Sequence, residues 1–133
     1  MKVYVGMGLT NAPKAFRDIF NGEFKDMLRA VPDVKVLDFI GLENGTEEDV
    51  YLHDRKCTEE ADLCIFICDH PSIGLGMEIA FRLFARRPMK CFVRSDVKIT
   101  RMVTGMCKVE GVVLHRYVTP KDIIRTCFPA ETV

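Results

Sequence analysis

This chain of 133 residues has no tryptophan, no excess charge of either sign and no long run of apolar residues. Nineteen basic residues balance nineteen acidic ones, so no charge field favours a nucleic acid polymer or an anionic membrane as partner. No apolar segment approaches the roughly 20 residues that cross a bilayer. Strand-like residues begin directly at the N-terminus, and without a leader segment we expect a cytoplasmic protein.

The chain also lacks Cys-x-x-Cys pairs, and its three histidines are scattered. Zinc sites usually combine closely spaced cysteines and histidines, so we expect no metal. A complete dinucleotide fingerprint and an ATP phosphate loop are missing as well, so we predict no cofactor. In a cytoplasmic protein the six cysteines should all be reduced thiols: Cys57, Cys64, Cys68, Cys91, Cys107 and Cys127.

Five short apolar segments alternate with segments of helical periodicity. The third apolar segment shows no alternation of polar and apolar residues, which is typical of a strand buried on both faces of a parallel sheet. This pattern predicts a single α/β domain over residues 1–133, with a flavodoxin-like, doubly wound, five-stranded parallel sheet of strand order 2-1-3-4-5. The expected strands are residues 2–6, 34–40, 61–68, 89–93 and 111–115.

Polar residues mark the expected starts of the helices. Thr46 followed by Asp49 has the form of a capping box and predicts a polar helix from residue 47 to about residue 60. Thr119-Pro120, with Asp122 behind them, predicts the last helix. Asn11 is expected to cap the first helix, in which Gly22 interrupts the periodic pattern.

The segment Gly74-Leu-Gly-Met-Glu78 is the most informative in the chain. It follows the third strand, and its pattern predicts a strand, a tight glycine turn and a helix with Glu78 in the first helical turn. In the expected strand order, the loops after the first and third strands meet at the topological switch point, where ligands bind. These loops contain Gly6-Met-Gly8 and residues 69–76, the two glycine-richest loops that follow strands. We therefore expect the functional site there.

Each candidate residue also has a structural interpretation. Glu78 could simply stabilise the helix dipole, and Tyr4 could be a core residue whose hydroxyl needs a partner. Asp54 could be a solvated surface residue, but it shares one helical face with His53 and Cys57. That face should pack toward the sheet, which would point Asp54 into the cleft. Gly6-Met-Gly8 could be only a turn.

A phospho-acceptor role for Asp69, as in two-component receiver domains, is a further interpretation of the end of the third strand. It would require acidic residues after the first strand, where Gly6-Met-Gly8 stands instead. The sequence therefore disfavours it.

The same residues carry a family resemblance. Val3-Tyr-Val-Gly-Met-Gly8 is similar to the opening strand and glycine turn of the nucleoside 2-deoxyribosyltransferases. Asp54 lies eight residues before Asp62, a spacing seen in that family, and Gly74-Leu-Gly-Met-Glu78 resembles the segment that carries its nucleophilic glutamate. The match covers residues 2–94 in order, and the last third of the chain matches only in pattern.

The resemblance implies a reaction and a role for each residue. Glu78 would attack the anomeric carbon of a 2'-deoxyribose and form a covalent glycosyl-enzyme. Asp54 would act as general acid on the departing base and then as base for the acceptor, while Tyr4 would orient Glu78. The glycines of the two loops would leave room for the sugar: Gly6, Gly8, Gly74 and Gly76. Leu9, directly after the first of these loops, is a further candidate for substrate binding.

The acceptor decides the reaction. A second nucleobase as acceptor makes the enzyme a transferase, whereas water makes it an N-glycoside hydrolase, and the superfamily also contains hydrolases of nucleoside 5'-monophosphates. Leu9 resembles the transferases, whereas Pro71-Ser72 resembles the hydrolases, in which the serine faces the phosphate. A non-catalytic nucleotide-binding module of the same fold is a third possibility.

The resemblance also implies a homo-oligomer, at least a dimer, with shared active sites. In the family a neighbouring chain supplies an asparagine or serine to the 5' end of the sugar. The corresponding region here is about Glu110-Gly111, which has neither residue. A carboxylate at Glu110 would bind a 5'-hydroxyl and repel a 5'-phosphate, which favours nucleosides and free nucleobases as substrates.

Overall fold

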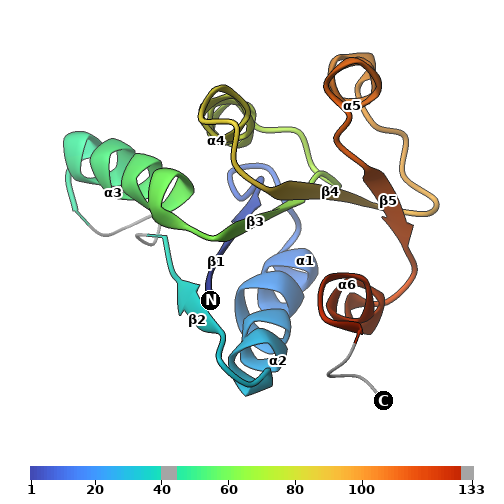
Figure 1. Cartoon of the computed structure of the whole chain (residues 1–133), viewed down its shortest axis with the longest axis horizontal. Coiled ribbons are helices and arrows are strands. Elements are labelled where there is room, and N and C mark those ends of the chain that lie inside the picture. The colour runs from blue at the N-terminus through green and yellow to red at the C-terminus, as the bar shows by residue number, and fades with distance from the viewer. Residues whose placement is uncertain (40–44, 130–133) are drawn as a thin grey trace.

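The computed structural model describes residues 1–39 and 45–129. Five parallel strands form one sheet in the order β2-β1-β3-β4-β5, so the predicted strand order is confirmed (Figure 1). The strands are β1 (Lys2–Met7), β2 (Lys35–Leu37), β3 (Leu63–Ile67), β4 (Met89–Arg94) and β5 (Leu114–Tyr117). Strand β2 is shorter than expected, and Ile40, the last residue of the predicted strand, lies outside the described residues.

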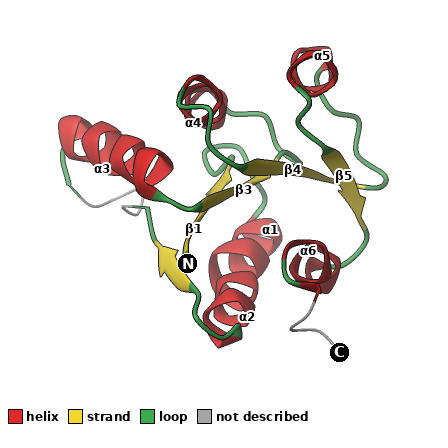
Figure 2. Cartoon of the chain, in the orientation of Figure 1, coloured by secondary structure: helices red, strands yellow, loops and turns green. Residues whose placement is uncertain are grey.

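Helices cover both faces of the sheet (Figure 2). One layer holds α1 (Lys14–Asp18), the π-helical segment η1 (Ile19–Glu23), α2 (Phe24–Ala30) and α6 (Pro120–Cys127). The other layer holds α3 (Glu47–Glu60), α4 (Ile73–Phe84) and α5 (Arg101–Glu110). No helix in the described ranges is long and apolar enough to cross a membrane.

The predicted capping box at Thr46 with Asp49 is confirmed, as is the predicted start of the last helix at Thr119, where Asp122 also completes a capping box. The predicted cap at Asn11 is wrong, because α1 begins only at Lys14, after Pro13, and no side chain caps it. Gly22 does not break the helix but lies within η1, where the helix widens by one residue per turn.

Strand β5 begins later than expected, at Leu114, because α5 continues to Glu110. Gly111 then ends α5 with a left-handed φ of 70°. Glycine adopts this conformation without strain, so the chain turns there before the strand can start.

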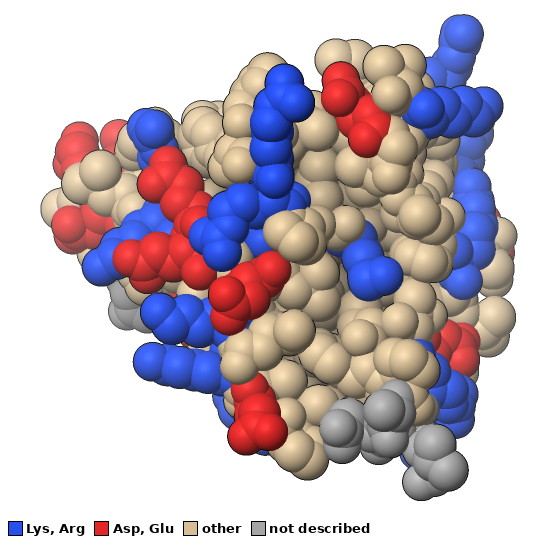
Figure 3. Space-filling view, viewed as in Figure 1, with Lys and Arg blue, Asp and Glu red and all other residues tan. Residues whose placement is uncertain are grey.

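Two apolar clusters fill the spaces between sheet and helices, because side chains alternate along each strand. Val3 and Val5 of β1 point toward α1, α2 and α6, whereas Tyr4 points toward α3, α4 and α5. On the outside, acidic and basic side chains are interspersed and neither sign covers the face in Figure 3.

Candidate active site

The two glycine loops meet at the carboxyl edge of the sheet, as expected for a switch point. A Cβ atom on Gly8 would lie 2.3 Å from the backbone oxygen of His70 and 3.1 Å from Cβ of Ser72. A Cβ atom on Gly6 would lie 2.6 Å from the Phe66 ring. Close packing therefore requires both glycines. The predicted turn at Gly6 is wrong, because Gly6 lies within β1, and only Gly8 belongs to the loop whose backbone approaches that of His70.

Helix α4 starts earlier than the sequence suggested. Its first residue is Ile73, and the Ser72 hydroxyl caps it by accepting a hydrogen bond from the Leu75 backbone N–H at 3.3 Å. The predicted glycine turn is therefore wrong, because Gly74 and Gly76 are helical, and Glu78 lies in the second turn rather than the first. A Cβ on Gly76 would meet no atom within 4 Å, so the first turn of α4 has an open surface.

Glu78 and Tyr4 form the centre of the site. Only 9% of Glu78 and 1% of Tyr4 are exposed, and the Tyr4 hydroxyl donates a hydrogen bond to Glu78 Oε2. The other carboxylate oxygen, Oε1, lies 3.4 Å from the place where a Cβ of Gly6 would be. One oxygen of Glu78 is thus held by the sheet, while the other faces the first glycine loop.

Asp54 lies on α3, on the face that packs toward the sheet. Cys57, one turn further along, is buried, and Asp54 and His53 are half-buried. The charge of Asp54 acts on both Glu78 and Tyr4, so the structure brings the three predicted residues into one electrostatic cluster.

Burial raises the pKa of Glu78 to about 8. The hydrogen bond from Tyr4 opposes this rise, the negative charge of Asp54 adds to it, and the positive charge of Lys25 again lowers the pKa. Burial, with the charge of Glu78 as the next cause, also raises the pKa of Tyr4 far above its ordinary value. The hydroxyl therefore stays protonated and remains a hydrogen-bond donor to the carboxylate.

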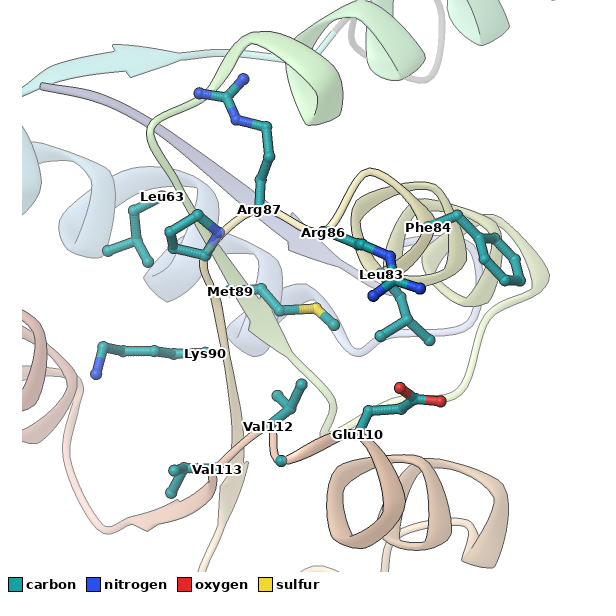
Figure 4. A pocket seen from close by; sticks show the side chains of 12 residues that line it. Leu63, Leu83, Phe84, Arg86, Arg87, Met89, Lys90, Glu110, Val112 and Val113 are labelled. Carbon is teal, nitrogen blue, oxygen red and sulfur yellow. The ribbon is translucent and has the colours of Figure 1, made fainter.

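Two predicted residues lie away from Glu78. Leu9 packs against the apolar cluster beneath α1 and α2, on the other face of the sheet. Glu110 ends α5 and lines a cavity of about 730 Å³ with Leu63 and Met89, the first residues of β3 and β4 (Figure 4). Glu110 therefore lies at the amino edge of the sheet, opposite the glycine loops of the same chain.

Sequence reasoning missed Lys25, the buried lysine of α2 whose charge acts on Glu78. A lysine between apolar helical positions gives no sequence signal of burial. The sequence also predicted no partner for Asp69. In the structure its carboxylate accepts hydrogen bonds from the Tyr117 hydroxyl and, at 2.9 Å, from the Arg94 backbone N–H. In the described part of the chain, no three residues of the metal-binding types gather.

Comparison with known proteins finds relatives and solved structures that carry the names of nucleoside- or nucleotide-processing enzymes. No family model matches the chain. Two archaeal proteins named "Putative 2'-deoxynucleoside 5'-phosphate N-hydrolase 1", from Methanosarcina mazei and Methanosarcina barkeri, are each 35% identical over 60 residues. A protein of the same name from Thermofilum pendens is 29% identical over 97 residues. These matches cover 45%, 45% and 67% of this chain, but only 37%, 38% and 65% of the relatives.

Solved structures share the whole fold. The CMP N-glycosidase BcmB of Clostridium botulinum superimposes with a TM-score of 0.70 over 96% of this chain and 98% of that one, at 15% identity. The resemblance to the nucleoside 2-deoxyribosyltransferase superfamily is confirmed. The 2-deoxyribosyltransferase of Bacillus psychrosaccharolyticus has a TM-score of 0.66 and 15% identity over 100% of this chain and 97% of its own. One of these two structural neighbours is thus named an N-glycosidase and the other a deoxyribosyltransferase, and both share the fold of this chain.

Proposed function

We propose that this protein cleaves the N-glycosidic bond of 2'-deoxynucleosides and transfers the deoxyribosyl group to a second nucleobase. The observation that carries the proposal is the buried carboxylate of Glu78, which is held by the Tyr4 hydroxyl and lies within the field of Asp54. It stands where the two glycine loops meet, and this arrangement suits a fixed nucleophile at a sugar-binding edge.

The first step is a displacement at the anomeric carbon. The Glu78 carboxylate attacks C1' and forms an ester, while the N-glycosidic bond breaks and its electron pair leaves with the base. Asp54 gives its proton to the departing base. The transition state has oxocarbenium character, so the negative charge of Glu78 stabilises it before the new bond is complete.

The second step reverses the first. The acceptor base loses its proton to Asp54 and attacks C1', and Glu78 leaves as a carboxylate. Tyr4 occupies Oε2 throughout, so Oε1, beside Gly6, is the oxygen that forms the ester. A side chain at position 6 would stand against that oxygen, which gives the glycine a chemical reason beyond its contact with Phe66.

Hydrolysis of 2'-deoxynucleoside 5'-monophosphates is the second candidate. Ser72 caps α4 through the Leu75 N–H, and Gly74 and Gly76 place no side chain over the first turn, which leaves space for a phosphate at the start of the helix. The three archaeal relatives also carry the name of this activity. Water would then take the place of the acceptor base in the second step.

Product analysis separates the candidates. The protein is incubated with a 2'-deoxynucleoside alone, with the same nucleoside plus a second free base, and with the 5'-monophosphate. Exchange of the base supports the transferase, whereas free deoxyribose or release only from the monophosphate supports a hydrolase. No release from any substrate would leave a non-catalytic nucleotide-binding module.

We also propose that the protein is a homo-oligomer whose subunits meet through α4 and α5. Ile73, Met77 and Phe84 follow helical spacing along the outer side of α4, and Met102 and Val109 do so on α5. All five are exposed, and exposed large apolar side chains on two helices of one layer suit an interface with another chain.

Light scattering tests the interface. The doubly substituted Ile73→Lys, Val109→Lys protein should be monomeric, whereas Val118→Lys, which changes an exposed apolar residue near the other helical layer, should keep the native mass. A monomeric native protein at micromolar concentration contradicts the proposal.

A further inference from the structure

Another cavity, of about 270 Å³, lies at the carboxyl edge of the sheet, between α1, η1 and the start of α6. Arg94 and Tyr117, the last residues of β4 and β5, line it. Tyr117 belongs to the apolar cluster of this face, whereas Tyr4 belongs to the cluster of the opposite face. The cavity is therefore distinct from the proposed active site, although both lie at the edge where open α/β sheets bind ligands.

Aromatic rings form the walls of this cavity. The centres of the Phe16 and Phe20 rings are 4.8 Å apart, and the Phe20 and Tyr117 rings follow at 5.7 Å. The His70 ring meets Phe16 edge to face at 4.6 Å. Aromatic groups prefer stacked or edge-to-face neighbours, so walls of this kind suit a planar aromatic ligand.

The π-helical segment η1 contributes to the same cavity. Its first two residues, Ile19 and Phe20, line it. Such segments are rare and occur frequently at functional sites. The irregular turn of this helix therefore lies at the cavity, on the face of the sheet opposite Tyr4.

A buried carboxylate provides the charged group of the cavity wall. Asp69 is 8% exposed, and its two oxygens accept one hydrogen bond each, from the Tyr117 hydroxyl and the Arg94 backbone N–H. These three residues all line the cavity. A carboxylate oxygen has two lone pairs, so each can accept one more hydrogen bond. Because the Arg94 guanidinium is paired with Asp96 at 2.6 Å, the wall favours a ligand with N–H donors over an anion.

The His70 ring is a further polar group of the cavity. It is half-buried, and within residues 1–39 and 45–129 no hydrogen bond or ion pair joins it to another group. A neutral imidazole presents one N–H donor and one acceptor. Together with the Asp69 carboxylate, it can pair with a heterocycle that carries donors and acceptors along its edge.

The size of the cavity limits the ligand further. About 270 Å³ is slightly less than the roughly 300–1,000 Å³ of ordinary ligand pockets. A single heterocycle fits this space. A nucleoside 5'-monophosphate is disfavoured by its size and by the repulsion between its phosphate and the Asp69 carboxylate.

We propose that this cavity binds a free nucleobase, with the ring between Phe16 and Tyr117 and an N–H donor on Asp69. The choice of a nucleobase rests on the proposed function, which releases one base and consumes another. The site is separate from the position of the reacting base. It adjoins the active site through the segment 69–72, because His70 lines the cavity whereas Ser72 caps the helix that carries Glu78.

Amide chemical shifts test the site, with adenine as purine probe and cytosine as pyrimidine probe. At least one of them should shift the signals of His70 and Val118 saturably, since both residues line the cavity. Ala15→Phe fills the cavity from an exposed position of α1 and should weaken this binding at least about tenfold. Lys14→Phe, at an exposed neighbour that does not line the cavity, should bind as the native protein does.

Two further measurements test the chemistry of recognition. Asp69→Asn replaces one acceptor oxygen by a donor and should weaken base binding about tenfold. If this variant does not fold, Ala15→Phe decides alone. Choline, a cation that aromatic rings attract, should bind more weakly than the bases. The inference is overturned if neither base shifts these signals, if Ala15→Phe binds like Lys14→Phe, or if choline binds more tightly.

The inference and the proposed function fail in different ways. If bases are exchanged or released while the His70 and Val118 signals do not respond, only the inference is wrong. If the signals respond and Ala15→Phe abolishes the response, but no substrate is cleaved, the proposed function is wrong and the base-binding cavity stands.

Discussion

The two faces of the sheet are packed with different residues. Beneath α1, α2 and α6 the cluster consists almost entirely of large apolar side chains, including Phe16, Phe20, Phe24 and Leu28. Beneath α3, α4 and α5 five cysteines and an alanine take up much of the cluster, beside the buried polar groups of Tyr4 and Glu78. The first face stabilises the fold, whereas the second leaves room near the sheet for polar chemistry.

The outer surfaces of the two helical layers also differ, in how many large apolar side chains they expose. In the described residues, α1, η1, α2 and α6 expose no large apolar side chain, whereas α3, α4 and α5 expose Tyr51, Leu52, Ile73, Met77, Phe84, Met102 and Val109. The layer that holds the carboxylates is also the layer suited to contact another chain. The comparison indicates that the larger apolar packing and the proposed site lie on opposite sides of one sheet.

The largest effect on activity is expected from a substitution of Glu78, on the face of the sheet that α3, α4 and α5 cover. Glu78→Gln should lower kcat/KM by at least about 10³-fold, because the amide cannot form the ester intermediate. Stability should not fall, since the Tyr4 hydroxyl can still donate to the amide oxygen. Chromatographic product analysis measures the loss, and Glu110→Gln, at the other edge of the sheet, is the matched control. Activity within tenfold of the native protein would contradict the mechanism.

On the stabilising face, Phe24→Ala should lower the free energy of unfolding by about 4 kcal/mol, because Phe24 is fully buried. Cys91→Ala, at an equally buried position beneath α4 and α5, should cost about 1 kcal/mol, since it removes a single sulfur atom. Urea unfolding measures both changes. Equal losses would show that the two faces contribute alike.

Arg82→Met should lower the free energy of unfolding by about 3 kcal/mol. The buried guanidinium of Arg82 donates to the backbone oxygens of Thr58, Ala61 and Pro88 at 2.7–3.0 Å, and methionine leaves these carbonyls without donors. Arg87→Met, at an exposed position, serves as control in urea unfolding and should change stability by less than about 1 kcal/mol. A loss for Arg82→Met no larger than the control would contradict this role.

A pH dependence of stability is expected at Glu78. The pKa of Glu78 rises from 4.5 to about 8 on folding, so the unfolded chain releases this proton first as the pH increases. The stability of the native protein relative to Glu78→Gln should therefore fall between pH 4.5 and 8, by about 1 kcal/mol per pH unit. Urea unfolding of both proteins at matched pH measures the difference. A constant or rising difference would show that the carboxyl group is not held in its protonated form by burial.

Much of the fold follows from local signals. The capping boxes at Thr46 and Thr119 depend on residues three positions apart, and the unbroken apolar character of the third strand identifies it as central. The strand order was predicted from the alternation of strands and helices, and it is confirmed. The two glycine-rich segments that this order brings together do meet, because the backbone at Gly8 lies close to that of His70.

The start of α4 was misjudged because two glycines within four residues suggest a turn. Tertiary packing overrides that propensity, since Leu75, Glu78 and Ile79 are buried on one side of the helix and Ser72 caps it.

The position of Glu110 is a consequence of topology. A helix that follows a parallel strand starts at the carboxyl edge and ends at the amino edge, so its last residue cannot lie beside Glu78 of the same chain.

The burial of Lys25 could not be predicted, because it depends on Asp38 and Phe39, which follow a different element of the chain. Sequence spacing reveals neither the pair nor its distance from α3. The proposed nucleophile and acid were therefore accessible from the sequence, whereas their electrostatic surroundings were not.

The hydrogen bonds of Arg82 also determine how α4 can move. They attach its carboxyl-terminal half to the end of α3 and to the segments before β3 and β4. Within residues 1–39 and 45–129, the first turn, with Gly74 and Gly76, accepts no such hydrogen bonds from a side chain of another segment. Amide hydrogen exchange along α4 should therefore be graded, fast near Ser72 and slow from Glu78 onward. Substrate entry would then deform a single turn while the nucleophile keeps its place.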